Sequence, residues 1–449
     1  MTIAMVVSGL GGGVAGAGHN ADDHSENVEL VAEHAIVIQK DNPDTEENEQ
    51  VVAAGSDLAF QGDLLVAGSY EGVGFFKMRP TKPYLEQISF FPCAGGQGDV
   101  GVWGNLVFMS VDAPQKNSDC VLPAVAATPA EYGADGGWEG LRIISIKNLK
   151  RPKQVAAIKT PCGSHTHTIA PSGKKLYIYI ESYPLSGQGT GCNPVSHRKV
   201  SIMEVPLANP AKAKLLDPMA TPNTIGCHDI TMFPSRQLAV AACVSESQVW
   251  DVKNPAKPEL LATIHNPAIQ IHHSTGFTWD GKYLVLGDEF GGAAAGGCVG
   301  NSDVPMGAMW FYDIADPTSP EQVGYYAPPR VFEIPDDPEE AQRPRCTTHN
   351  FNIVPTKDQS SYIAVTSYYS VALSVVDFSD PTNAKEIGYY LPKESGKNPD
   401  SWSAYWYNGL IYTNDHGGGA GIRVFRMKEL NASTAHYFKT RLNPQTQMM

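Results

Sequence analysis

Four histidines occupy the same position in four consecutive sequence repeats, and imidazole is the side chain that most often binds a transition metal in proteins. Each lies six residues before the first turn of its repeat; the four are His165, His228, His273 and His349. Apolar residues follow each histidine at even spacing, as expected for a strand with one buried face. Three or four imidazole nitrogens suit copper, iron or zinc better than magnesium or calcium. The set therefore indicates a transition-metal site if the fold brings the four repeats to one point.

The repeat unit is two strand pairs long. Its second half is an apolar strand, a turn of Asp, Asn and Pro, and another strand, as in VWDVKNPAKPELLATI at 249–264 and VVDFSDPTNAKEIGYY at 375–390. Its first half is another strand pair, as in HDITMFPSRQLAVAAC at 228–243. Seven such pairs occur, and six of them are followed by a complete hairpin. A regular array of short strands separated by Pro, Asn and Asp predicts an all-β repeat architecture.

The seventh unit lacks one strand, which the N-terminal region can supply. Only GIRVFRM at 421–427 follows the last strand pair, whereas VELVAE at 28–33 resembles the hairpin strand ELLAT at 259–263. We therefore predict a seven-bladed β-propeller of four-stranded antiparallel blades, closed by residues 28–33 as the outermost strand of the seventh blade. Such closure covers a sheet edge that an open array would expose. We expect the propeller to span residues 28–430 and a C-terminal tail to span 431–449.

The hairpin form VVDFSDPTNAKEIGYY and the strand-pair form DVGVWGNLVFMS resemble the repeats of the LVIVD-repeat family of bacterial propellers. The resemblance covers about residues 28–430 and implies the propeller fold, but it implies little about function. The chain is more distantly similar to the selenium-binding protein and methanethiol oxidase propellers, which use channel histidines for copper. That similarity is one of architecture, because no long motif is shared. The four-histidine iron sites of carotenoid-cleaving propellers are a second analogy of the same kind.

In a propeller the four histidines would begin innermost strands, which line the central channel. Blades one, two and seven hold Ser56, Gly98 and Trp402 at this position, so one side of the channel would stay open, as a catalytic metal requires. Trp402 would help to wall the pocket. His167 lies two residues beyond His165 on the same strand face and is a candidate further ligand or a group that supports the ligands.

The next position along the innermost strands holds a hydrogen-bonding residue in all seven blades. We expect these residues to tie strand starts to the adjacent blade, with orientation of the imidazoles as an alternative role. They are Asp57, Asp99, Thr166, Asp229, Ser274, Asn350 and Ser403.

Eight cysteines form four local pairs, all of them on the face of the disc where the innermost strands begin. An even number of cysteines at short separations predicts disulfide bonds in an oxidising compartment. Thiolate metal ligands are the alternative, which the lack of a CxxC motif disfavours. The expected pairs are Cys93–Cys120, Cys162–Cys192, Cys227–Cys243 and Cys298–Cys346.

Charge and the N-terminal sequence bear on partners and location. Lys and Arg total 33 against 47 Asp and Glu, and no basic stripe occurs, which argues against nucleic acid as a partner. No run of 18 apolar residues occurs, so we expect no transmembrane segment. Residues 1–17 resemble a signal-peptide core and cleavage site without a basic start; residues 1–20 are thus a residual export signal or a disordered tail. We expect a secreted or periplasmic protein.

Three hypotheses for the function follow. The first is an exported copper- or iron-dependent oxidoreductase that acts on a small molecule, with dioxygen as a candidate partner and zinc or manganese as alternative metals. The second is a metal-dependent lyase or hydrolase that acts on an oligosaccharide or another carboxylate substrate. The third is a non-enzymatic binding propeller whose channel is closed by hydrogen-bonded histidines. The sequence does not name the substrate, the metal or the oligomeric state.

Overall fold

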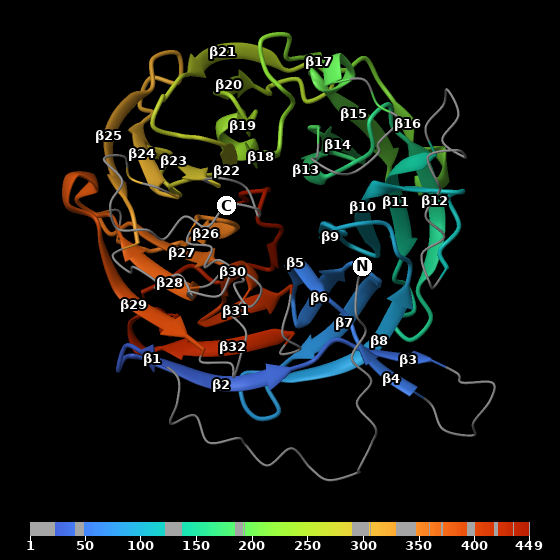
Figure 1. The fold of residues 1–449 in the computed structure, drawn as a ribbon, viewed down its shortest axis with the longest axis horizontal. Helices are drawn as coiled ribbons and strands as arrows, with labels where there is room; N and C mark the ends of the chain where they lie inside the picture. The colour runs from blue at the N-terminus through green and yellow to red at the C-terminus, as the bar shows by residue number, and fades with distance from the viewer. Residues whose placement is uncertain are drawn as a thin grey trace, which may run out of the picture.

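Seven antiparallel sheets stand around a central axis, as the pattern of repeats predicts (Figure 1). The computed structural model describes residues 23–40, 49–121, 137–184, 192, 194–289, 305, 307–328, 347–358, 360–369, 371–392, 400–416, 421–433 and 435–448. Among these residues no helix is long and apolar enough to span a bilayer. The described helices are single 3-10 turns: η1 (Pro194–His197), η2 (Pro210–Lys212), η3 (Pro234–Arg236), η5 (Pro381–Asn383) and η6 (Lys428–Leu430).

The first four blades each run from the channel outwards in chain order. Blade one holds β5 (Gly55–Gln61), β6 (Leu64–Ser69), β7 (Gly72–Met78) and β8 (Leu85–Pro92). Blade two holds β9 (Val100–Trp103), β10 (Leu106–Gln115), β11 (Trp138–Ser145) and β12 (Lys153–Lys159). Blade three holds β13 (Thr166–Ser172), β14 (Lys175–Glu181), β15 (Lys199–Pro206) and the short β16 (Lys214–Leu215) and β17 (Met219–Ala220). Blade four holds β18 (Asp229–Phe233), β19 (Leu238–Ala242), β20 (Ser247–Asp251) and β21 (Glu259–Ile264).

The last three blades complete the ring. Blade five holds β22 (His272–Phe277), β23 (Tyr283–Asp288), β24 (Met309–Asp313) and β25 (Glu321–Tyr326). Blade six holds β26 (Phe351–Ile353), β27 (Ile363–Tyr368), β28 (Val371–Asp377) and β29 (Lys385–Leu391), with β1 (Asp23–His24) added at its outer edge. Blade seven holds β30 (Ser401–Tyr407), β31 (Leu410–Asp415) and β32 (Ile422–Met427). Outside the blades, β3 (Val37–Lys40) pairs with β4 (Glu49–Val52).

The predicted closure is confirmed. Strand β2 (Val28–His34) pairs antiparallel with β32 and is the outermost strand of blade seven, in a register that runs from Val28 opposite Met427 to His34 opposite Ile422. The second described strand thus joins the last blade and covers its edge. This arrangement links the two ends of the ring by backbone hydrogen bonds.

Hydrophobic residues fill each interface between adjacent blades, so that neighbouring blades share a core. Strand alternation explains this: in β5, Leu58 and Phe60 face blade seven, whereas Ala59 between them faces blade two. Rings stack across these interfaces, as Phe311 and Phe378 do between blades five and six at a centroid distance of 4.6 Å. The resulting rigid ring fixes where each innermost strand begins.

The C-terminal segment enters the channel. Strand β33 (Arg441–Leu442) pairs with β5, and the described residues that follow it run inside the ring (Figure 1). The side-chain amide of Gln445 donates to Asp57 of blade one at 3.1 Å, and the hydroxyl of Thr446 donates to the carbonyl of Ile169 in blade three at 2.7 Å. Gln447 accepts from the N–H of Phe277 and donates to its carbonyl, at 3.1 and 2.6 Å. The segment therefore ties several blades together from inside.

Three of the predicted disulfides are formed. They are Cys93–Cys120, Cys162–Cys192 and Cys227–Cys243, with Cα–Cα separations of 4.2, 5.4 and 3.6 Å. The fourth expected pair, Cys298–Cys346, lies outside the described residues. The bonded pairs fix the segments that lead into the innermost strands of blades two, three and four.

Candidate metal centre

The four sequence-predicted histidines lie together at one end of the channel. His165, His228 and His349 immediately precede or open innermost strands, and His273 lies at the start of β22. Successive rings are in contact, with centroid distances of 4.4 Å from His165 to His228, 3.8 Å from His228 to His273 and 4.4 Å from His273 to His349. None of the four is more than 4% exposed. Residues from four different blades thus form one buried row of imidazoles.

Hydrogen bonds orient the two histidines at the ends of this row. Nδ1 of His165 lies 2.8 Å from Oδ2 of Asp112, and Nδ1 of His349 bonds to the backbone carbonyl of Trp402. Because a carboxylate and a carbonyl only accept, each Nδ1 carries the hydrogen and each Nε2 keeps its lone pair. Both end histidines therefore present a metal-binding nitrogen, and an acceptor behind the ring holds each in place.

The two inner histidines carry nitrogens without a described hydrogen-bond partner. Within the described residues, Nδ1 of His228 and both ring nitrogens of His273 lack one. Burial, followed by the charges of the neighbouring histidines, lowers the pKa of both residues well below the usual value. Their imidazoles are therefore neutral at pH 7, which is the form that binds a metal.

Spacing between the nitrogens fits a shared ion. Nε2 of His165 lies 2.9 Å from Nε2 of His228. Two nitrogens that are each about 2.05 Å from one metal ion, at a right angle to each other, lie about 2.9 Å apart. When no ion is bound, the same distance requires His228 to donate its Nε2 hydrogen to the lone pair of His165.

Glu289 adds a carboxylate that the sequence analysis did not single out. It follows β23 directly, and its N–H donates to the carbonyl of Ile271 at 3.1 Å, which fixes its backbone beside the start of β22. Its Oε2 lies 3.6 Å from Nε2 of His273, and its Oε1 lies 3.9 Å from Nε2 of His349. One ligand atom each of His228, His273 and Glu289 lies within 4.8 Å of the other two. These separations suit ligands on a common ion at about 2.0–2.2 Å.

Aromatic rings surround the row. The ring of Tyr183 lies 4.9 Å from that of His165 and 5.0 Å from that of His228. At the other end, the rings of Trp402 and Tyr369 lie 4.6 and 4.5 Å from that of His349. Trp402 thus lies beside the row of histidines, in a position from which it can line one side of the pocket. Such rings exclude water and lower the local dielectric constant, which strengthens charge interactions with an ion.

His167 is directed elsewhere. Its Nδ1 lies 2.9 Å from Oγ of Ser110 and 2.9 Å from Oδ2 of Asp99, and its Nε2 lies beside Gly101 of β9. The ring therefore packs between blades two and three. Among the described residues its Nε2 has no hydrogen-bond partner, and the role of His167 as a further ligand or as a group that supports the ligands stays a prediction.

The hydrogen-bonding residues one position after the histidines, along the innermost strands, join neighbouring blades. Thr166 donates to the carbonyl of His228, Ser274 to that of His349 and Ser403 to that of Ser56. Two of these bonds hold the backbone of a histidine of the row. The hydroxyls therefore set the spacing between adjacent strand starts, and with it the spacing of the imidazoles.

The acidic residues at that position lie deeper in the channel. Asp57 accepts from Oη of Tyr405 at 2.5 Å as well as from Gln445, and Asp99 accepts from the N–H of His167 at 2.9 Å. Oδ1 of Asp229 accepts from the N–H of Ile230 at 3.0 Å. Burial, followed by the charge of Asp99, raises the pKa of both Asp57 and Asp229. These contacts are to backbone and side-chain donors of the protein itself.

The residues that sequence reasoning missed share one position in the repeat. Tyr183, Glu289 and Tyr369 lie just after the end of a second strand, and Asp112 lies near the end of β10, on the face where the innermost strands begin. Three of them stand at the start of long insertions, at 112–138, 183–197 and 290–306. Alignment of this position across the blades is the signal that would have found them.

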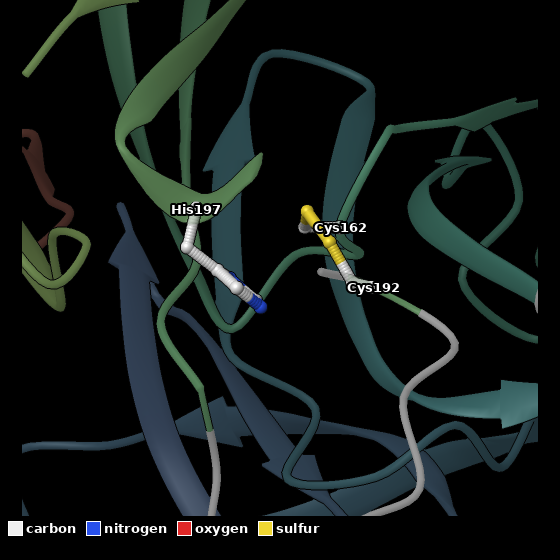
Figure 2. A group of neighbouring side chains, drawn as sticks. All are labelled: Cys162, Cys192 and His197. Carbon is white, nitrogen blue, oxygen red and sulfur yellow. A yellow bond between two sulfur atoms is a disulfide. The ribbon is translucent and has the colours of Figure 1, made fainter. Parts of the chain in front are cut away.

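A second group of metal-type donors lies in blade three. Figure 2 shows His197 beside the sulfurs of Cys162 and Cys192, and one donor atom of each lies within 4.8 Å of the others. The two sulfurs are bonded to each other, and a disulfide lacks the thiolate that binds a metal. Nδ1 of His197 lies 3.1 Å from Oγ of Ser182 instead. This group is a disulfide with a histidine packed beside it.

No family model and no curated protein matches the chain, so the resemblance to the LVIVD-repeat family rests on the repeat pattern alone. Solved structures do match. Hydrazine synthase from Kuenenia stuttgartiensis is 10% identical with a TM-score of 0.54, over 84% of this chain and 96% of that chain. The periplasmic gluconolactonase of Pseudomonas aeruginosa is 11% identical with a TM-score of 0.51, over 77% and 86%. The fold is a β-propeller. At these identities the likeness extends to the fold alone.

A third structure bears on the more distant similarity noted in the sequence. A hypothetical selenium-binding protein from Sulfolobus tokodaii is 10% identical over 81% of this chain and 90% of that chain, with a TM-score of 0.47. That score is too low to support an argument about the site.

Proposed function

We propose that the protein is an exported metalloenzyme in which His165, His228, His273, His349 and Glu289 bind one transition-metal ion for oxidoreductase chemistry on a small molecule. The observation that carries the proposal is the buried row of imidazoles with orphaned nitrogens. A buried polar atom without a partner destabilises the fold by about 1–3 kcal/mol. An ion bound to one ring nitrogen each of His228 and His273 and to Glu289 would satisfy one orphaned nitrogen on each ring.

Other features of the row support an ion over a structural role. A histidine that only closes a channel needs a protein donor or acceptor for its ring. His165 and His349 have such a partner at Nδ1, yet both turn Nε2 towards the other members of the set. A carboxylate behind a ligating histidine is a common arrangement at metal sites, because it fixes the tautomer and raises the basicity of the ligand.

The donor set favours iron or copper, with iron first. His228, His273 and Glu289 make up two imidazoles and one carboxylate, the set that holds non-haem iron in oxygenases. When bound, such an ion supplies one-electron and dioxygen chemistry. The protein residues would hold it and keep water out. Asp112 and the carbonyl of Trp402 orient two ligands, and the rings of Tyr183 and Trp402 cover the site.

A hydrolase or lyase is the second candidate. Two histidines and a glutamate also form the protein ligand set of some catalytic zinc sites, in which the ion activates water or polarises a carbonyl. Glu289 is the specific observation in favour of this candidate, since a row of imidazoles alone does not suggest it. Zinc or manganese in the isolated protein, and activity without dioxygen, would favour it over the oxidoreductase.

Export is part of the proposal. The three disulfides present in the structure are typical of proteins that mature in an oxidising compartment. The metal would therefore be acquired in the periplasm or outside the cell. Expression for any metal analysis should accordingly be directed to the periplasm.

Elemental analysis of the purified protein tests the proposal. We expect about one equivalent of iron or copper per chain in the wild type, and a loss of most of it in His228→Ala. Glu289→Gln should bind the ion with lower affinity but still fill when excess metal is supplied. His272→Ala is the matched control, because His272 is buried beside His273 but lies 2.8 Å from Oγ of Ser247. Wild-type protein that stays free of metal after reconstitution with Fe²⁺, Cu²⁺ and Zn²⁺ would refute the proposal and favour a binding propeller.

A further inference from the structure

Tyr369 has an unusual backbone conformation next to the metal centre. Its φ of 49° lies in the left-handed region, which large side chains rarely adopt. The residue follows β27 directly, and its carbonyl accepts from the N–H of Ser401 at 3.0 Å. Outliers of this kind persist only where the surrounding structure enforces them, and they cluster at functional sites.

This conformation directs the side chain into the site. Tyr369 is 1% exposed, and its ring packs against that of His349. Its Oη donates to Oε1 of Glu289 at 2.7 Å, a bond that joins blade six to blade five. The tyrosine therefore fixes one of the two oxygens of the carboxylate that the proposed centre uses.

We propose that Tyr369 is a positioning residue that restricts Glu289 to ligation through Oε2 alone and so keeps one coordination position open; this inference rests on the proposed metal centre. Oε1 is engaged by the phenol, whereas Oε2 is the oxygen nearer to a histidine nitrogen, 3.6 Å from Nε2 of His273. A carboxylate can bind a metal through one oxygen or through both. Ligation through both would occupy the position that a catalytic site leaves open for substrate.

Removal of the phenolic hydroxyl isolates this role. Tyr369→Phe keeps the ring against His349 and the same backbone conformation, but it removes the hydrogen bond from the phenol to Oε1 of Glu289. Oε1 already lies 3.9 Å from Nε2 of His349, so a small rotation would bring it to an ion bound among the nitrogens. The effect of the tyrosine should therefore depend entirely on the carboxylate of Glu289.

A double-mutant cycle with copper as the probe tests this. Wild type, Tyr369→Phe, Glu289→Gln and the double variant are loaded with Cu²⁺ alone, and azide is titrated as an external ligand by its absorption band and by electron paramagnetic resonance. We expect Tyr369→Phe to raise the azide dissociation constant at least about tenfold in the wild-type background. In the Glu289→Gln background the same substitution should change the azide dissociation constant less than about twofold, because Tyr369 acts through the carboxylate that this variant lacks.

Each outcome has a distinct meaning. Tyr369→Phe with wild-type azide affinity and an unchanged copper spectrum would overturn the inference while leaving the metal centre intact. An equal loss in both backgrounds would overturn it too, because the tyrosine would then act without Glu289. Wild-type protein that binds none of Cu²⁺, Fe²⁺ and Zn²⁺ would refute the metal centre itself. Tyr412→Phe, a buried tyrosine in the core between blades seven and one, controls for the loss of a hydroxyl and should leave the azide constant unchanged.

Discussion

Nε2 of His165 lies 2.9 Å from Nε2 of His228, although 63 positions separate the two residues in the chain. Because Nδ1 of His165 donates its hydrogen bond to Asp112, Nε2 of the neutral imidazole presents its lone pair to His228. The pair is therefore held together either by a single hydrogen from His228 or by an ion that both nitrogens bind. The ring of blades sets this distance, since each histidine stands at the start of an innermost strand.

Asp112 should control metal affinity without touching the metal. Asp112→Ala leaves Nδ1 of His165 without its acceptor, so the ring can turn and change tautomer. We expect the affinity for Fe²⁺ or Cu²⁺ to fall about 10- to 100-fold, measured by competition with a chelator. Asp217→Ala, at an exposed aspartate, should leave it unchanged. Equal affinities in the two variants would show that the carboxylate does not orient this ligand.

Gln447 should stabilise the propeller from within its channel. Gln447→Ala leaves both the N–H and the carbonyl of Phe277 without a partner. We expect the free energy of unfolding to fall by about 1–3 kcal/mol, because buried backbone groups would lose their hydrogen bonds. Chemical denaturation measures this, with the exposed Gln50 as the control in Gln50→Ala. An unchanged midpoint for Gln447→Ala would mean that the C-terminal segment does not hold the blades together.

Removal of the closing strand should cause aggregation. Deletion of residues 1–34 removes β2 and exposes the edge of β32, which can then pair with other chains. We expect light scattering to detect large species and the melting temperature to fall. Deletion of residues 1–20 keeps β2 and should have neither effect. A monomeric 1–34 deletion with unchanged melting would contradict the role of β2 in closure.

Glu139 should make stability depend on pH. Burial, followed by the charge of Asp112, raises the pKa of Glu139 to about 8 from the usual value of 4.5. A carboxyl group whose pKa is higher in the folded state binds more protons when folded, so the stability it contributes falls as pH rises from about 4.5 to 8.

Glu139→Gln should remove that fall and raise the free energy of unfolding at pH 8 by at least about 1 kcal/mol relative to wild type. Urea unfolding between pH 5 and 8 measures the difference. The exposed Glu259 serves as the control in Glu259→Gln, which should leave the pH profile as it is. Parallel profiles for wild type and Glu139→Gln would show that this carboxyl group is ionised in the folded protein.

The fold was predictable because the same strand and turn pattern recurs in every blade. Each blade carries the same alternation of apolar residues and the same turn residues, so seven weak copies reinforce one another. The absent strand of the last blade then identified residues 28–33, and β2 occupies the expected place. The histidines were found for the same reason, since one column of the repeat becomes one ring of the channel.

The remaining residues of the site share a position in the repeat but not a residue type, so the repeat pattern alone does not mark them. Glu289 reaches the histidines because its backbone is held to Ile271, a contact between neighbouring segments of blade five that only the fold reveals. The direction of the Tyr369 side chain depends on a left-handed backbone conformation, which an aromatic residue in the sequence does not predict. The C-terminal segment matches no part of the repeat. Gln445 and Gln447 lie in the channel because they bond to Asp57 and Phe277, and these contacts appear only in the folded structure.

Anomalous diffraction from crystals loaded with Fe²⁺ or Cu²⁺ tests the central claim most directly. We predict one anomalous peak at the metal edge, about 2.0–2.2 Å from Nε2 of His165 and from Nε2 of His228. His228→Ala crystals prepared in the same way should lose this peak, whereas His272→Ala crystals should keep it. A fully loaded crystal with no peak among the four histidines, or with its peak elsewhere on the chain, would contradict the assignment of the metal centre.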